Sequence, residues 1–199
     1  MAHIKFIFSE IPANKYGIIN YYEKTRNAIS YKYETLQPEF FGMAESEISE
    51  IKENLLNELS IESSFSLLAY IESCFRTDFI IRRNWRKRDP LTVIYKKEFK
   101  PNQKIYQYPL VDGIFASWKQ VYKDIDGIND LFSRLIQAFD FRNWIAHGRY
   151  WHFKDNINKY DFNSMLILCQ LVEPQIRNPT KVSERCGPNR QECDFSSLD

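Results

Sequence analysis

The sequence predicts a mainly α-helical domain, and three observations support that expectation. Apolar residues repeat at intervals of three and four in several segments, as they do on the buried face of a helix. Hydrophobic residues make up 44% of the 199 residues and aromatic residues 16%, which is enough for a substantial core. No stretch approaches the ~20 apolar residues of a membrane span, and the first residues do not resemble a secretory signal. We expect one domain over residues 1–177, a polar tail over 178–199, no membrane association and a cytoplasmic location.

The first half of the chain contains three segments of different character. Residues 4–37 mix apolar and polar side chains without one period, so they suit either a helix or a hairpin. Residues 44–59 have apolar positions on one side and glutamates on the other, which predicts an amphipathic helix. The hydroxyl-bearing residues among 60–64 then predict a new helix start. Residues 65–83 are apolar around most of the circumference, which predicts the central helix of the core.

A basic segment follows, and it is concealed by a net charge of only +1. The residues that could bind RNA here are Arg82, Arg83, Trp85, Arg86, Lys87 and Arg88. Their charges suit phosphates and the indole offers a stacking surface, although a solvated helix end explains the same residues equally well. Asp89-Pro90 predicts the end of the helix, because proline disfavours helical backbone in the preceding residue. Residues 91–109 are then expected to form a small hairpin or a long basic loop.

The second half predicts three more helices. Helical periodicity covers residues 111–122 and 128–139, with Gly127 as a breaker between them. A last helix is expected over 162–176, with Asp161 as its N-cap and Pro174 near its end.

The four cysteines do not suggest a metal site. Cys74 and Cys169 fall in apolar helical segments, where buried free thiols are expected, whereas Cys186 and Cys193 fall in the polar tail. Their spacings match no zinc-binding pattern. We therefore expect no metal and no other cofactor.

The segment that carries candidate chemistry is FRNWIAHGRYW, residues 141–151. If the helix that begins at Ile128 continues, Arg142 extends its apolar stripe and needs a partner, because an unpaired buried charge is costly. Asn143 and His147 are four positions apart and share a face. Arg142 and His147 are five apart, and are therefore separated by about 140°. Gly148 predicts the helix end, which puts His147 in the last turn or just beyond it, where it could turn towards the arginine.

On spacing alone, a helix that happens to end in arginine, histidine and glycine is the more common explanation. The full pattern, Arg142-Asn143-x-x-x-His147-Gly148, resembles the arginine, polar residue and histidine signature of the HEPN superfamily, the higher-eukaryote and prokaryote nucleotide-binding helical domains. Residues 68–76, LAYIESCFR, are similar to an earlier core helix of prokaryotic members. The resemblance covers roughly residues 45–176.

The resemblance implies an all-α bundle of four to five helices, dimeric, with two copies of the motif facing each other across a cleft. Many members are metal-independent endoribonucleases of toxin–antitoxin and other defence systems. His147 would then act as a general acid or base on the 2′-hydroxyl or the leaving oxygen. Arg142 would hold the phosphate, and Asn143 would orient the histidine or a phosphate oxygen.

Further residues are expected to support this site. Glu72 and Arg76 are four apart on one helical face, so they can pair with each other or with a neighbouring helix. Arg149, Tyr150 and His152 could contact RNA, although packing is the other role open to Tyr150 and to Trp151 beside it. The expected partners are an RNA substrate, a second copy of the chain, and an antitoxin or other regulatory protein.

One departure from the family concerns the antitoxin. Members silenced by nucleotidyl transfer carry a tyrosine two residues after the histidine, whereas Tyr150 lies three residues after His147. This difference argues against a paired nucleotidyltransferase as the antitoxin.

Two alternatives to a nuclease also stay open, because fold does not fix function. One is a catalytically silent HEPN-like module that binds RNA, nucleotide or protein; the other is an unrelated helical interaction domain that docks through its acidic and basic faces.

Overall fold

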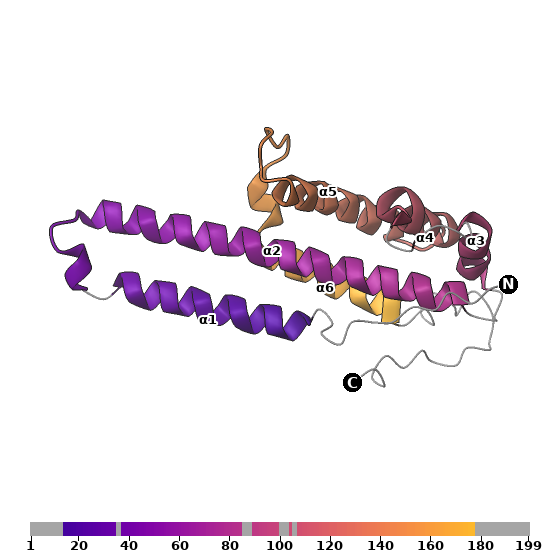
Figure 1. Cartoon of the computed structure of the whole chain (residues 1–199), viewed down its shortest axis with the longest axis horizontal. Coiled ribbons are helices and arrows are strands. Elements are labelled where there is room, and N and C mark those ends of the chain that lie inside the picture. The colour runs from indigo at the N-terminus through magenta and orange to yellow at the C-terminus, as the bar shows by residue number, and fades with distance from the viewer. Residues whose placement is uncertain (1–13, 35–36, 85–88, 100–103, 105–106, 178–199) are drawn as a thin grey trace.

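The computed structural model describes residues 14–34, 37–84, 89–99, 104 and 107–177, and Figure 1 shows their arrangement. These residues form six α-helices: α1 Lys15–Glu34, α2 Glu45–Asn84, α3 Pro90–Glu98, α4 Ala116–Tyr122, α5 Ile128–Ala146 and α6 Phe162–Arg177. Single 3-10 turns lie at Pro38–Phe40 and Ile157–Tyr160, and a π-helical turn at Leu110–Phe115 leads into α4. No strand occurs in the described residues, so the predicted all-α fold is confirmed, with six α-helices where four to five were expected.

The 40-residue helix α2 is the element on which the others pack. α1 runs antiparallel beside its N-terminal half, and α6 lies along its C-terminal half (Figure 1). α5 lies on another side of the C-terminal half of α2, and α4 and α3 lie towards the C-terminal end of α2 (Figure 1). None of the helices in the described ranges is long and apolar enough to span a membrane.

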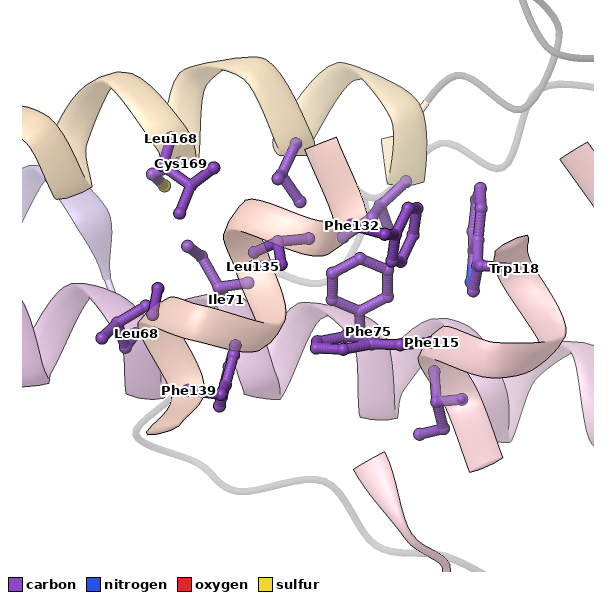
Figure 2. Packing of buried hydrophobic residues seen from close by; sticks show 14 of the residues in the cluster. Leu68, Ile71, Phe75, Phe115, Trp118, Phe132, Leu135, Phe139, Leu168 and Cys169 are labelled. Atoms are coloured by element: carbon purple, nitrogen blue, oxygen red, sulfur yellow. The ribbon is translucent and has the colours of Figure 1, made fainter. Parts of the chain in front are cut away.

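The core lies where α2, α4, α5 and α6 meet (Figure 2). Phe75 of α2 makes edge-on contacts with Phe115, Trp118 and Phe132, at ring-centroid distances of 4.8, 5.9 and 5.8 Å. Such edge-to-face pairs stabilise beyond their buried area. Leu135 and Phe139 of α5 and Leu168 and Cys169 of α6 pack against the same cluster. This packing holds α5 against α2 and so determines where the C-terminal end of α5 lies.

The predicted helix start at residues 60–64 is wrong. α2 continues through this segment without a break, and Ser63 and Ser64 are buried side chains within it. The Ser60 hydroxyl accepts a hydrogen bond from the backbone N–H of Phe162 at 2.9 Å, so it satisfies the first turn of α6 and not a helix of its own. Within the undecided N-terminal segment, residues Lys15–Glu34 form the helix α1.

The predicted hairpin or basic loop over 91–109 is wrong for residues 91–98, which are helical, whereas the other described residues of this range lie outside any α-helix. Residues Pro90–Glu98 form α3, with Asp89 as the N-cap whose side chain accepts from the backbone N–H of Thr92 at 3.2 Å. Pro90 occupies the first turn, where its missing N–H has no intrahelical partner to lose. Asp89-Pro90, which disfavours continuation of a helix before it, therefore begins α3.

The three helices predicted in the second half are confirmed. They correspond to α4, α5 and α6, and Asp161 caps α6 by accepting from the backbone N–H of Ser164 at 2.8 Å. Gly113, in the π-helical turn, lies so close to Tyr108 that a Cβ would come within 2.8 Å of its ring. Cys169 is buried and Cys74 is half-buried, and neither forms a disulfide. The tail, with Cys186 and Cys193, lies outside the described residues.

Candidate functional site

The C-terminal end of α5 has a defined geometry that places His147 at the exit of the helix. His147 is the C-cap, and Gly148 follows with a φ of 79°, which glycine adopts without strain. The Gly148 N–H donates to the Ile145 carbonyl at 2.9 Å and the Arg149 N–H donates to the Trp144 carbonyl at 3.0 Å. These two bonds form a Schellman motif. His147 is exposed at this helix end, which is where the helix was predicted to end from the presence of Gly148.

Arg149 fastens this exit to α2. Its Nη1 and Nη2 donate to the two carboxylate oxygens of Glu58 at 2.8 and 2.6 Å, and its guanidinium lies over the Trp144 ring at 5.8 Å. Hydrogen bonding from Arg149 lowers the pKa of Glu58. A bidentate pair of this kind has a fixed orientation. Glu58 therefore engages two of the five N–H donors of Arg149 and neutralises its charge.

Arg142 points from α5 towards α2. Its Nη2 lies 3.2 Å from Glu72 Oε2, and its guanidinium lies over the Phe65 ring at 5.5 Å. Its Nη1 donates to Asn143 Oδ1 at 3.2 Å. The arginine thus has the partner that its place on the apolar stripe requires, while 29% of its side chain stays exposed.

Glu72 connects two arginines. Besides Arg142, it accepts from Arg76 Nε at 2.7 Å, and Arg76 Nη1 donates to the Tyr108 carbonyl at 3.2 Å. The two kinds of pairing considered for Glu72, within its helix and to a neighbour, therefore occur together. The network holds Arg142 in place from α2.

The structure brings Arg142, Asn143 and His147 to one end of α5 but directs their side chains differently. The His147 ring lies 5.9 Å from the Trp151 ring in the loop that follows, whereas Arg142 contacts α2. Asn143 links the two, since its side chain accepts from Arg142 and its carbonyl accepts from the His147 N–H at 3.0 Å. The helix end leaves the histidine near the exit loop.

A pocket of about 390 Å³ opens beside this cluster, between α5 and the loop that follows it. α5 contributes Gln137, Asp140 and Asn143, and the loop contributes Trp151, His152 and Lys154. Sequence reasoning missed Gln137, Asp140 and Trp151 as site residues. The sequence does contain a signal for the helical part of this wall. The polar residues Gln137, Asp140 and Asn143 are three positions apart, which places them on one side of the helix.

Asp155, which also lines this pocket, is held in the charged form by its hydrogen bonds. Its oxygens accept from Lys159 Nζ at 2.7 Å, from the Tyr160 hydroxyl at 2.6 Å and from the Asn156 N–H at 2.8 Å. These bonds, the one from Lys159 first, lower the pKa of Asp155 from 3.8 to about 2. Its stabilising contribution is present above the unfolded-state pKa and is lost as pH falls through the folded one.

We therefore expect the free energy of unfolding to decrease as pH falls from about 4 towards 2, and to decrease less in an Asp155→Asn variant. Urea titrations at several pH values measure this difference. Asp126→Asn, at an exposed position between α4 and α5, is the matched control and should keep the wild-type pH dependence. Equal pH dependence of wild type and Asp155→Asn would contradict the assignment.

Two of the predicted RNA contacts in the basic segment are wrong. Arg82 is 1% exposed, and its Nε donates to both oxygens of Asp78 at 2.8 Å while its Nη1 donates to Asp89 at 3.1 Å. Arg83 is 8% exposed and its guanidinium lies 5.7 Å from the centre of the Phe99 ring. Both side chains belong to the interior, because they have carboxylate or aromatic partners there. The other predicted contacts in this segment, Trp85, Arg86, Lys87 and Arg88, lie outside the described residues.

The residues predicted to bind RNA after the motif are accessible. Tyr150 is 80% exposed and contacts the Trp151 ring edge-on at a centroid distance of 4.7 Å. His152 is exposed and lines the pocket. Their contact with RNA stays a prediction.

No protein family model, curated protein or solved structure matches this chain. Within the described residues, no group of three or more His, Cys, Asp or Glu side chains is placed to hold a metal ion, so we assign no metal ligands. A function must be inferred from the chain's own residues.

Proposed function

We propose that this chain is a metal-independent endoribonuclease of the HEPN type. The observation that carries the proposal is the Arg142-Asn143-x-x-x-His147 motif, which lies at an exposed helix end beside a pocket. An imidazole can transfer protons and a guanidinium can stabilise negative charge, and these are two functions that cleavage of a phosphodiester through its own 2′-hydroxyl requires.

The proposed reaction assigns one task to each residue. The ribose 2′-oxygen attacks phosphorus and loses its proton, the bond to the 5′-oxygen breaks, and that oxygen gains a proton. The products are a 2′,3′-cyclic phosphate and a 5′-hydroxyl. His147 would transfer one of these protons and water the other, and Arg142 would stabilise the charge that develops on the phosphate. Asn143, which already accepts a hydrogen bond from Arg142, would orient that guanidinium.

A second copy of the chain is part of the proposal. Within one chain Arg142 contacts α2, whereas His147 lies by the exit loop. A phosphate bound at one of these side chains would therefore need a second copy of the chain to supply the other. Two α5 ends facing each other would bring two exposed histidines and two arginines to one cleft. The exposed position of both His147 and Tyr150 is compatible with such an approach.

The test is cleavage of single-stranded RNA by the purified full chain in the presence of a chelator. We expect fragments that end in a 2′,3′-cyclic phosphate, at a rate that the chelator leaves unchanged. RNA that stays intact at every protein concentration, or cleavage that appears only with added divalent cations, would exclude this reaction.

A catalytically silent module that binds RNA, nucleotide or a protein is the second candidate, and the ion pair between Glu72 and Arg142 favours it. Glu72 already neutralises the arginine, and a phosphate must compete with that carboxylate. Such a module would bind RNA without turnover, and its binding would survive the loss of His147. Absence of binding at low salt would instead favour an unrelated helical interaction domain.

A further inference from the structure

We propose that the pocket between α5 and residues 151–155 is a nucleobase subsite that takes one unpaired base next to the scissile phosphate. This inference rests on the proposed ribonuclease and adds what that enzyme recognises. Three features of the described residues carry it: the position of the pocket, its aromatic wall and its charge.

The pocket adjoins the motif on the side of His147. Trp151 lines the pocket and its ring lies 5.9 Å from the His147 ring. Asn143 lines the pocket as well, and its side chain accepts from Arg142. A nucleotide whose phosphate lies at His147 would therefore have an adjoining base within reach of the pocket.

Trp151 offers a stacking surface that the protein holds in place. The Trp144 Nε1 donates to the Trp151 carbonyl at 2.8 Å, and Tyr150 packs edge-on against the Trp151 ring. Trp151 still keeps 37% of its surface exposed. Stacking on an aromatic side chain accepts any base, because every base has a π face. The volume of about 390 Å³ lies within the range of about 300–1,000 Å³ that is typical of small-ligand pockets.

The charges at the pocket favour a neutral base over a phosphate. Two carboxylates, Asp140 and Asp155, line it together with a single lysine, Lys154. Asp155 already accepts hydrogen bonds from Lys159, Tyr160 and a backbone N–H. Asp140 is on the exposed face of α5 and is the carboxylate placed to accept from a ligand.

A carboxylate only accepts hydrogen bonds, so it selects a group that donates. Adenine, cytosine and guanine carry exocyclic amino groups with two N–H donors each, whereas uracil offers one ring N–H and otherwise carbonyl oxygens. The geometry thus points to a preference for amino-bearing bases over uracil. Asp140→Asn would add a donor and weaken that preference.

Binding of 2′-O-methyl oligonucleotides to the full chain tests the subsite, because such RNA lacks the attacking hydroxyl and stays intact. Fluorescence anisotropy gives Kd for hexamers of adenosine, cytidine or uridine and for an adenosine hexamer with two central abasic positions. Stacking contributes about 5- to 150-fold in affinity per base, so Trp151→Ala should raise Kd for the adenosine hexamer by about tenfold. Trp151→Phe should restore most of the affinity. Phe41→Ala is the matched control, since Phe41 is 96% exposed on the turn between α1 and α2.

The selectivity test compares wild type with Asp140→Asn. We expect wild type to bind adenosine and cytidine hexamers severalfold more tightly than the uridine hexamer, and Asp140→Asn to reduce this ratio. The abasic hexamer should bind wild type and Trp151→Ala equally. RNA binding that is insensitive to Trp151→Ala and to Asp140→Asn would overturn the subsite and leave the ribonuclease standing. Absence of any RNA binding would overturn both.

Discussion

Asp78→Ala is expected to lower the free energy of unfolding by about 3–5 kcal/mol, because it leaves the Arg82 guanidinium buried beside one carboxylate where it now has two. The Arg82 side chain is 1% exposed, so water cannot replace the lost partner. Burial taken alone would lower the pKa of Arg82, and the charge of Asp78, with smaller contributions from its neighbours, raises it above its ordinary value. Asp78 is therefore the group that makes this interior charge tolerable.

Chemical denaturation of the full chain measures the change. Glu50→Ala is the matched control, because it removes an exposed carboxylate from the same helix and should stay within about 0.5 kcal/mol of wild type. Replacing both partners, in an Asp78→Leu and Arg82→Met double variant, should recover much of the loss, since apolar pairs of similar volume often substitute for buried ion pairs. A loss below about 1 kcal/mol in Asp78→Ala would show that the pair is not what stabilises this end of α2.

Periodicity predicted most helices of this fold because it reports directly on burial. The segments around Phe132, Leu135 and Phe139 and around Leu168 and Cys169 show apolar residues three and four apart, and these residues are the core in the structure. Capping chemistry was equally local at Asp161, whose side chain acts within its own first turn. Information of this kind is contained in a few consecutive residues.

The wrong predictions concern residues whose partners are distant in sequence, or whose residue type is compatible with more than one structural role. Ser60 has a helix-starting side chain, but its hydroxyl serves Phe162, a hundred residues later. Arg82 is indistinguishable by sequence from a solvated arginine, and only the approach of Asp78 and Asp89 makes it a buried one. Asp89-Pro90 marks a helix boundary, but which side of it is helical depends on packing.

The candidate site shows the same division. The helix end at Gly148 and the position of His147 follow from local chemistry, and so does the common face of residues 137, 140 and 143. The contact of Arg142 with Glu72 joins two helices and needed the fold to be seen. The pocket also needed it, because its second wall comes from the loop that the Schellman motif redirects.

His147→Ala is expected to reduce the rate of RNA cleavage by about 100- to 10,000-fold, which is the usual contribution of a positioned acid or base. The change should leave the fold intact, because the imidazole is exposed and the C-cap bonds of this residue are made by its backbone. Denaturation midpoints of wild type and variant check that point. Asp126→Asn, at an exposed position just before the N-terminus of α5 and therefore at the other end of that helix from His147, is the control and should cleave at the wild-type rate.

Comparing cleavage with binding separates the catalytic role of His147 from a structural one. If His147 transfers a proton, the His147→Ala variant should bind uncleavable 2′-O-methyl RNA within a few-fold of wild type while its turnover collapses, because the imidazole then acts on the transition state more than on the bound substrate. A parallel loss of binding and turnover would instead assign His147 to RNA recognition. Equal cleavage by variant and wild type would contradict the proposed chemistry, since the exposed imidazole at the end of α5 would then take no part in it.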